Sequence, residues 1–228
     1  MEARAEGLLL LDKPAGITSH HAVMLARRIY HEKSIGHLGT LDPFATGLLI
    51  LLLGRFTRLA TFIDTEPKVY DATIRFGSET ATDDCTGEVI RQAATPSLTV
   101  VRSMIPQLTG KIAQVPPAYS AKSVDGTRAY DAARKGEPLD LAPVDVNVVK
   151  WIIREARATE IDVTIECGTG TYIRSLARDL GRLSGSAAHL SALRRTASGQ
   201  FNVRDATTIE TLKSTPPGLR QLRVVADA

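Results

Sequence analysis

The sequence contains only two cysteines, and they stand far apart. Cys85 and Cys167 belong to no CxxC pair and to no cluster of cysteine and histidine. Disulfide-stabilised scaffolds and structural zinc sites both need a denser spacing of cysteines, so we exclude both classes. We expect the two thiols to behave as small, buried apolar side chains.

The sequence also lacks a long hydrophobic run. The longest uncharged apolar stretch, Leu48–Leu53, is too short to cross a membrane, and the first residues, MEARAEG, carry mixed charges instead of the apolar core of a signal peptide. We therefore expect a soluble, cytoplasmic protein without a membrane partner. We also expect a monomer. No GxGxxG or GxxxxGK[ST] motif is present either, so no nucleotide-binding loop is indicated.

An excess of one charge is nearly absent, since the net charge is only +3 in 228 residues. The positive charge is nevertheless concentrated in one segment. Between 174 and 204 there is a single acid, Asp179, against six arginines, at positions 174, 178, 182, 194, 195 and 204. Such a concentration is typical of a surface that binds a polyanion.

Hydrophobic periodicity predicts the secondary structure. The alternation from Tyr70 to Phe76 has the period of a strand with one wet face, and the apolar spacing from Ala22 to Tyr30 is that of a helix, which Thr18 or Ser19 can cap. Strands are predicted at 8–11, 70–76, 144–153 and 160–167, helices at 19–30, 100–108, 129–135 and 172–183, and a loop at 36–47. The run Leu48–Gly54 fits a buried strand and a buried helix equally well.

These segments favour an α+β fold with a mixed, largely antiparallel sheet and flanking helices. The segments 144–153 and 160–167 are joined by a short linker, which suits an antiparallel pair. A doubly wound parallel sheet would instead alternate strands with long crossover helices. The chain is 43% hydrophobic, which is enough for one sizeable core.

Three arginines stand four residues apart on the predicted helix 172–183. Arg174, Arg178 and Arg182 lie on a different face from the apolar stripe and repel one another by a few tenths of a kcal/mol per pair. One interpretation is a solvated face offset by Asp179 and by glutamates from elsewhere. The other is a nucleic-acid backbone, because the arginine fork suits phosphate and "LRRT" follows close behind.

The stretch "GHLGTLDPFATG" presents one carboxylate, Asp42, in a glycine-rich loop directly before Pro43. Glycines allow a ligand to approach the backbone closely, but Asp before Pro is also common in an ordinary turn. His37 by itself is more often a surface or capping residue. The segment also resembles the nucleophile loop of haloacid-dehalogenase-type phosphatases, although the second aspartate of that motif is missing.

Five motifs, taken in order, resemble those of the bacterial tRNA pseudouridine-55 synthases, the B-type pseudouridine synthases. The resemblance extends from about Gly7 to Phe201. The motifs are LLLLDKPAGITS (8–19), GHLGTLDPFATG (36–47), KVYDATIRFGSETATDDCTGE (68–88), QVPPAYSAKSVDGTRAYDAARKGE (114–137), and CGTGTYIRSLARDLG (167–181) followed by AHLSALRRTASGQF (188–201). The resemblance implies the α+β catalytic fold of that family.

The resemblance also implies the catalytic residues. Asp42 corresponds to the essential carboxylate, Tyr70 to the tyrosine that contacts the target base, and Arg174 to the arginine that pairs with the catalytic acid. The chemistry agrees, because the isomerisation of uridine to pseudouridine adds nothing from outside and needs no cofactor and no metal. One carboxylate suffices, either by attacking the sugar or by removing its 2′ proton. Flipping the base costs a few kcal/mol, which stacking on Tyr70 can partly offset.

The remaining implied residues contact the substrate, which is the T arm of tRNA. His37 engages the stem and takes the place of the displaced base, Tyr172 lies against the nucleotide, Leu193 lines the base pocket, and Lys13 supports the site. We also expect four arginines to bind phosphates of the T arm: Arg178, Arg182, Arg194 and Arg195.

The sequence departs from the family in two places. Leu38 and Thr40 replace a threonine and an alanine of the loop, which alters its packing without touching Asp42. Family members also continue into a PUA-type RNA-binding domain, and we expect that domain to be absent here, because this chain stops about where it would begin. We therefore expect a catalytic domain over 1–205, a short, loosely held tail over 206–228, and weaker tRNA affinity with intact chemistry.

Two alternatives belong to other classes. One is a non-catalytic module that binds or folds tRNA and keeps the fold and the arginine patch from Arg174 to Arg204. The other is a subunit guided by a small RNA, which we disfavour because such proteins carry the PUA domain that holds the guide. We therefore expect no guide RNA as a partner.

Overall fold

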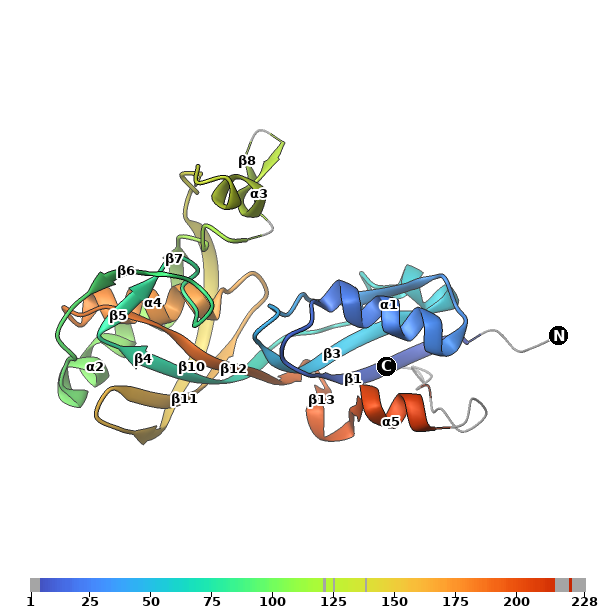
Figure 1. Cartoon of the computed structure of the whole chain (residues 1–228). Helices are drawn as coiled ribbons and strands as arrows, with labels where there is room; N and C mark the ends of the chain where they lie inside the picture. Colours follow the sequence, from blue (N-terminus) through green and yellow to red (C-terminus); the bar gives the residue numbers. More distant parts are fainter. Residues whose placement is uncertain (1–4, 121, 125, 138, 216–221, 223–228) are drawn as a thin grey trace. The chain divides into compact units, whose positions relative to one another are not determined.

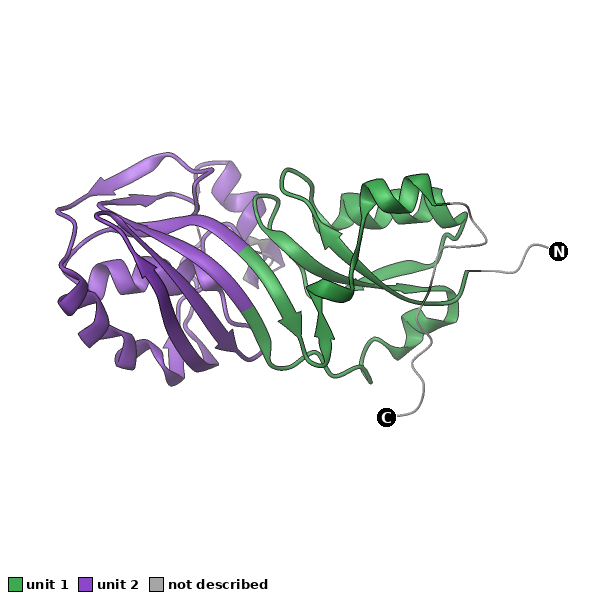
Figure 2. Cartoon of the chain, turned by 90° about the horizontal axis from the view of Figure 1, so that it is seen from below, with its two compact units in different colours: residues 1–69, 194–228 green, residues 70–193 purple. Residues whose placement is uncertain are grey.

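The computed structural model describes residues 5–120, 122–124, 126–137, 139–215 and 222. The chain divides into two compact units, Met1–Val69 with Arg194–Ala228 (unit 1) and Tyr70–Leu193 (unit 2) (Figure 2). Two strands, β4 (Lys68–Phe76) and β12 (Ala188–Ser198), each begin in one unit and end in the other. The expected domain boundary at 205 lies inside unit 1, and the catalytic domain over 1–205 stays a prediction.

Unit 1 is built on two leucine-rich strands, β1 (Gly7–Lys13) and β3 (Thr46–Leu53), which pair antiparallel. Every leucine from Leu8 to Leu11 and every residue from Leu48 to Leu53 is buried, so both faces of this pair are covered. The sheet is completed by β2 (Ile35–Leu38) on β3, β14 (Thr207–Thr208) parallel to β1, the end of β12 parallel to β3, and β13 (Phe201–Asn202) on β12.

Helix α1 (Ser19–Tyr30) packs Ala22, Val23 and Ala26 into the core of unit 1. It begins where predicted, because the side chain of Thr18 accepts a hydrogen bond from the backbone N–H of His21 at 2.9 Å. Figure 1 shows α1 and α5 (Ile209–Ser214) on opposite sides of β1 and β3. Two 3₁₀ turns, η1 (Gly54–Leu59) and η3 (Val203–Asp205), complete the unit.

Two predictions for unit 1 need correction. The predicted loop 36–47 is shorter, because β2 and β3 extend into it and pair from Ile35↔Leu53 to Leu38↔Ile50. Part of the expected loose tail is structured: β14 pairs with β1, and α5 buries Ile209 and Leu212. The rest of that tail, 216–221 and 223–228, lies outside the described residues.

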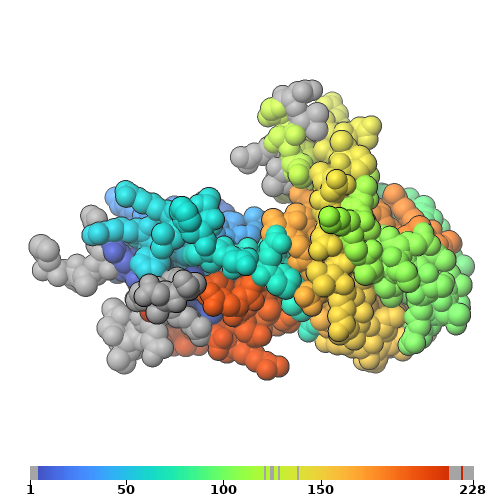
Figure 3. Space-filling model, turned by 180° about the vertical axis from the view of Figure 1, so that it is seen from behind, coloured from blue at the N-terminus to red at the C-terminus, as the bar shows by residue number. Residues whose placement is uncertain are grey.

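Unit 2 contains strands in the order β12, β4, β11 (Glu160–Cys167), β10 (Val144–Ala156) and β7 (Gly110–Gln114), and β10 pairs antiparallel with both β11 and β7. The predicted pair is confirmed, with Trp151 opposite Ile165. In Figure 3 the yellow strand β10 lies beside the green segment that includes β7. Two short hairpins accompany the sheet, β5 (Ser78–Thr80) with β6 (Val89–Gln92) and β8 (Ser123–Val124) with β9 (Thr127–Arg128).

The helices of unit 2 occur where the sequence predicts them: α2 (Leu98–Met104), α3 (Ala129–Arg134) and α4 (Ile173–Leu183). The predicted helix 100–108 is divided, since its second half is the 3₁₀ turn η2 (Ile105–Leu108) with Pro106 near its start. Helices flank a mixed, largely antiparallel sheet, which confirms the α+β prediction. No helix in the described part of the chain is long and apolar enough to span a membrane.

The two cysteines occupy different environments. Cys167 is buried at the end of β11, as expected, but Cys85 is exposed. The prediction of two buried thiols is therefore wrong for Cys85, which lies in the loop between β5 and β6.

Candidate active site

In unit 1, the half-buried Asp42 lies in the loop between β2 and β3. Hydrogen bonds inside and beside the loop fix its path. The carbonyl oxygen of Asp42 accepts from the N–H of Ala45 at 3.2 Å, and that of Pro43 accepts from the N–H of Gly16 at 2.8 Å. The carboxylate is thus carried by a backbone with a defined conformation, tied to the turn after β1.

Lys13 forms a hydrogen bond with the same loop. Its side chain is fully buried, and its ammonium group donates to the carbonyl oxygens of Pro14 and Ile17 at 2.9 Å and of Pro43 at 3.4 Å. Burial lowers the pKa of Lys13 to about 8, with a smaller contribution from Arg195, while the carboxylate of Asp42 acts in the opposite direction. The supporting role that the resemblance implies for Lys13 stays a prediction.

Arg195 is buried, with 1% of its surface exposed, and holds the other end of the loop. Its Nε donates to the carbonyl oxygen of Leu48 at 2.8 Å and its Nη2 to that of Gly39 at 3.1 Å. The expectation of an exposed, phosphate-gripping guanidinium is therefore wrong at this position. Arg194 differs, because its side chain is 40% exposed while it forms two hydrogen bonds with the carboxylate of Asp12, at 3.0 and 2.7 Å.

His37 is half-buried on β2. Burial is the main cause that lowers its pKa, and the positive charges of Arg195 and His20 lower it further. The imidazole is therefore neutral at neutral pH. Its Nδ1 is buried and has no hydrogen-bond partner within the described part of the chain. A neutral ring suits contact with a nucleotide through its face, not ion pairing with phosphate.

In unit 2, Tyr70 and Leu193 are both buried, on β4 and β12. Tyr172 is half-buried and precedes the first turn of α4. The side-chain amide of Gln114 clamps its backbone, since the N–H of Tyr172 donates to Oε1 at 2.8 Å and Nε2 donates to the carbonyl oxygen at 3.1 Å. This pair of bonds fixes the start of the helix that carries Arg174.

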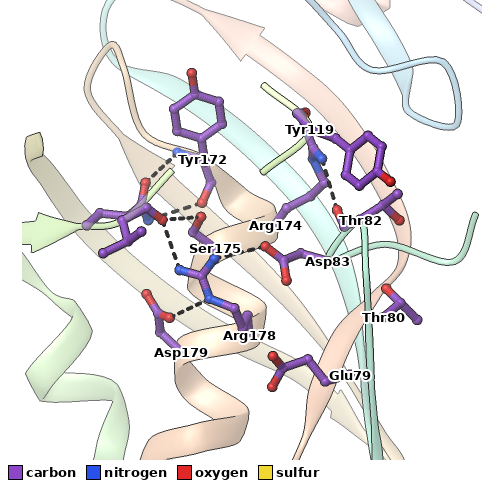
Figure 4. A network of polar contacts seen from close by, with 12 residues as sticks. Glu79, Thr80, Thr82, Asp83, Tyr119, Tyr172, Arg174, Ser175, Arg178 and Asp179 are labelled. Atoms are coloured by element: carbon purple, nitrogen blue, oxygen red, sulfur yellow. Dashed lines mark hydrogen bonds and ion pairs between the residues drawn. The ribbon is translucent and has the colours of Figure 1, made fainter. Parts of the chain in front are cut away.

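Arg174 is buried and its guanidinium is held by backbone carbonyl groups (Figure 4). Nη1 donates to the oxygen of Thr82 at 2.9 Å, and Nη2 donates to that of Tyr119 at 3.0 Å. The carboxylate of Asp84 lies 3.8 Å from Nη1, and its other oxygen accepts three hydrogen bonds from Thr82 and Thr86. The cation is therefore fixed in position by two loops of unit 2.

Arg178 is the centre of the buried network in Figure 4. Its guanidinium donates to Asp83, to Asp179 and to the carbonyl oxygen of Val115, each at 2.9 Å. Burial raises the pKa of Asp83 to about 6, although Arg178 and Arg174 oppose this shift. Arg182 pairs with the buried Glu79, and 55% of its side chain remains exposed.

The prediction of an exposed arginine face on α4 is thus wrong for Arg174 and Arg178. The anions that offset their charges are the protein's own carboxylates, as one of the two interpretations held, but the face is buried instead of solvated. Of the arginines expected to bind phosphate, Arg182 and Arg194 keep substantial exposure. For these two residues the phosphate contact stays a prediction.

We expect Arg178→Met to destabilise unit 2 by about 3 kcal/mol, because it leaves Asp83 buried without its cation. Urea unfolding followed by the fluorescence of Trp151, which lies in unit 2, measures the loss. Adding Asp83→Asn should restore part of the stability, and Arg102→Met, at an exposed position of α2, should change little. An unchanged urea midpoint together with weakened RNA binding would contradict this structural role.

Sequence reasoning missed the residues that hold the functional ones in place. Two of them, Ser19 and Gln114, bind backbone groups of residues that are distant in the sequence. The third, Asp83, binds the distant Arg178. All three lie inside the motifs, but nothing in their type or spacing indicates which groups they contact.

Comparison with known proteins supplies the family. A sequence model described as "TruB family pseudouridylate synthase (N terminal domain)" matches residues 27–173, and the "tRNA pseudouridylate synthase B C-terminal domain" matches residues 174–216. Two curated relatives are named tRNA pseudouridine synthase B. That of Arthrobacter sp. (strain FB24) is 44% identical, over 90% of this chain and 70% of the relative. That of Mycobacteroides abscessus is 45% identical, over 90% of this chain and 72% of the relative.

Solved structures agree with the sequence matches. A Cbf5-Nop10-Gar1 complex contains a chain with 27% identity and a TM-score of 0.69, over 90% of this chain and 52% of that one. An H/ACA RNP bound to a substrate RNA containing 2′-deoxyuridine contains a chain with 25% identity and a TM-score of 0.67. The match covers 90% of this chain and 51% of that one. The chain thus spans about half the length of these solved chains. Sequence and fold together show that the chain belongs to the TruB family and is a pseudouridine synthase.

Proposed function

We propose that the protein isomerises uridine 55 in the T loop of tRNA to pseudouridine, with Asp42 as the catalytic carboxylate. The observation that carries this proposal is the backbone around Asp42, which Ala45, Gly16 and the buried Lys13 hold from several sides. A catalytic side chain needs such a rigid support, because it must be held close to its productive position. The curated relatives, whose printed name is tRNA pseudouridine synthase B, support tRNA as the substrate.

The reaction rearranges bonds within one nucleotide. The bond from C1′ to N1 of uracil breaks, the base turns, and C1′ bonds to C5, while C5 loses a proton and N1 gains one. No atom is added, so one carboxylate suffices, whether it attacks C1′ or removes the 2′ proton to give a glycal. Tyr70 stacks on the flipped base, and Arg174 keeps the catalytic acid ionised, as the resemblance implies.

The T arm of tRNA is bound directly, without a guide RNA and without a cofactor. Arg182 and Arg194 are the proposed phosphate contacts, since their side chains are substantially exposed. Each is already oriented by a carboxylate, Glu79 or Asp12, so little side-chain freedom is lost when RNA binds.

Incubation of the purified protein with an unmodified tRNA transcript tests this function. Neither cofactor nor guide RNA is added, and carbodiimide mapping or mass spectrometry locates any pseudouridine. We expect a single new pseudouridine at position 55 and none in a transcript with cytidine at that position. Binding without modification would favour the non-catalytic tRNA-binding or tRNA-folding module, and a requirement for added guide RNA would favour the guided subunit.

The pKa of Lys13 predicts an alkaline limb in the pH profile of the activity, that is, a fall in rate as the pH rises. In the folded protein the ammonium group loses its proton as the pH rises through about 8, and with it one donor and its charge. The longest of its three bonds, to Pro43 at 3.4 Å, is the one we expect to be lost. Activity should fall about fivefold, the equivalent of one hydrogen bond of about 1 kcal/mol.

Single-turnover rates between pH 6.5 and pH 9.5 measure this limb. Lys13→Met should be slower at pH 7 and should lack the limb, because it has no proton to lose. An identical limb in Lys13→Met would assign the pH dependence to another group.

A further inference from the structure

The hydroxyl of Ser19 forms two hydrogen bonds with a single residue, Leu41. Oγ donates to the carbonyl oxygen of Leu41 at 3.0 Å and accepts from its N–H at 2.9 Å. Ser19 is 2% exposed and Leu41 is 3% exposed, so both bonds are shielded from water. Leu41 directly precedes Asp42 in the sequence.

The serine is not needed to begin its own helix. Thr18 caps α1 through the N–H of His21, which leaves the Ser19 hydroxyl available to the loop. Ala22, Val23 and Ala26 anchor the same helix in the core of unit 1. The hydroxyl is therefore carried by a rigid element, while the residue that it holds belongs to a loop.

Both peptide groups that flank the Cα of Asp42 are thereby fixed. The carbonyl oxygen of Leu41 belongs to the peptide that enters Asp42, and Ser19 binds it. The carbonyl oxygen of Asp42 belongs to the peptide that leaves it, and the N–H of Ala45 binds it at 3.2 Å. The orientation of these two planes sets the direction of the bond from Cα to Cβ, and hence the position of the carboxylate.

We infer that Ser19 is a positioning residue for the catalytic carboxylate. This inference rests on the proposed function of Asp42. Without the hydroxyl, the peptide before Asp42 loses a donor and an acceptor at once and can rotate. A displacement of about 1 Å in a catalytic group can cost a hundredfold in rate, whereas the affinity for tRNA depends on contacts elsewhere.

Ser19→Ala tests this inference, with Ser198→Ala as its matched control. Ser198 is also 2% exposed in unit 1, and its hydroxyl donates to the carbonyl oxygen of Thr65 at 3.1 Å, which is not part of the Asp42 loop. Both variants remove one buried hydroxyl. Single-turnover rate, tRNA Kd and thermal midpoint are measured for both, beside the wild type and Asp42→Asn.

For Ser19→Ala we expect a single-turnover rate at saturating tRNA about 10- to 100-fold lower, with the tRNA Kd within threefold of wild type. Ser198→Ala should keep the wild-type rate. A rate within twofold of wild type for Ser19→Ala, an equal loss in both variants, or a change in Kd alone would overturn the inference. An inactive wild type or an active Asp42→Asn would instead overturn the proposed function.

Discussion

Asp42→Asn is expected to abolish pseudouridine formation, with a loss of more than about a thousandfold. The amide has nearly the shape of the carboxylate, but it carries no charge and is neither a nucleophile nor a base. The loop should keep its conformation, because Ser19, Lys13 and Ala45 form hydrogen bonds with backbone groups of the loop, and the substitution does not remove these bonds. The loss therefore measures the chemistry of the side chain.

The measurement compares product yield with tRNA affinity. Single-turnover mapping of position 55 gives the rate, and filter binding gives the Kd, which should stay within a few-fold of wild type. Asp64→Asn, at an exposed position of unit 1, should retain full activity. Modification by Asp42→Asn at a rate near that of wild type would exclude Asp42 as the catalytic residue.

The secondary structure was predictable wherever one face of an element is exposed to solvent. The alternation from Tyr70 to Phe76 predicts β4, and the period of Ile161 to Cys167 predicts β11, because polar side chains mark the other face. The run Leu48–Leu53 carries no such mark, since its strand is buried on both faces. Only its pairing with Leu8 to Leu11 of β1 decides that it is a strand.

The site was predictable at the residues of the motifs, but not in its internal contacts. Spacing places Arg174, Arg178 and Arg182 four residues apart, which suggests a common ligand for all three. One partner of Arg178 is Asp83, 95 residues away in the sequence, and no periodicity connects the two. An arginine can form either a buried ion pair or an exposed phosphate contact. The residue type is the same in both cases, so only the fold shows which contact is made.

The contacts that fix the backbone are the least visible in the sequence. Ser19 and Gln114 each bind the N–H and the carbonyl group of one distant residue. Every residue except proline offers these two groups, so the identity of the partner leaves no trace in its residue type. Such contacts can therefore be identified only in the structure, although they position the catalytic and binding side chains.

Gly47→Ala is expected to destabilise unit 1 by more than about 4 kcal/mol, the upper end of what single substitutions cost. Gly47 has a φ of 102° and lies on β3 opposite Arg195 of β12. A Cβ at this position would lie 2.3 Å from the carbonyl oxygen of Arg195 and 2.8 Å from its nitrogen. Both atoms are backbone, so they can move only if the pairing of β3 with β12 breaks.

Gly16→Ala is the control that separates this steric effect from backbone strain. Gly16 has a φ of 86°, but nothing lies within 4 Å of an added Cβ, so we expect a cost of only about 1 kcal/mol. Urea unfolding followed by circular dichroism compares the two variants. Gly47→Ala should also displace Arg195, which then loses its hydrogen bond to Gly39 in the Asp42 loop. The activity of this variant should therefore fall at urea concentrations below its unfolding midpoint. Equal urea midpoints for the two variants would show that β12 accommodates the methyl group, and would contradict the predicted clash.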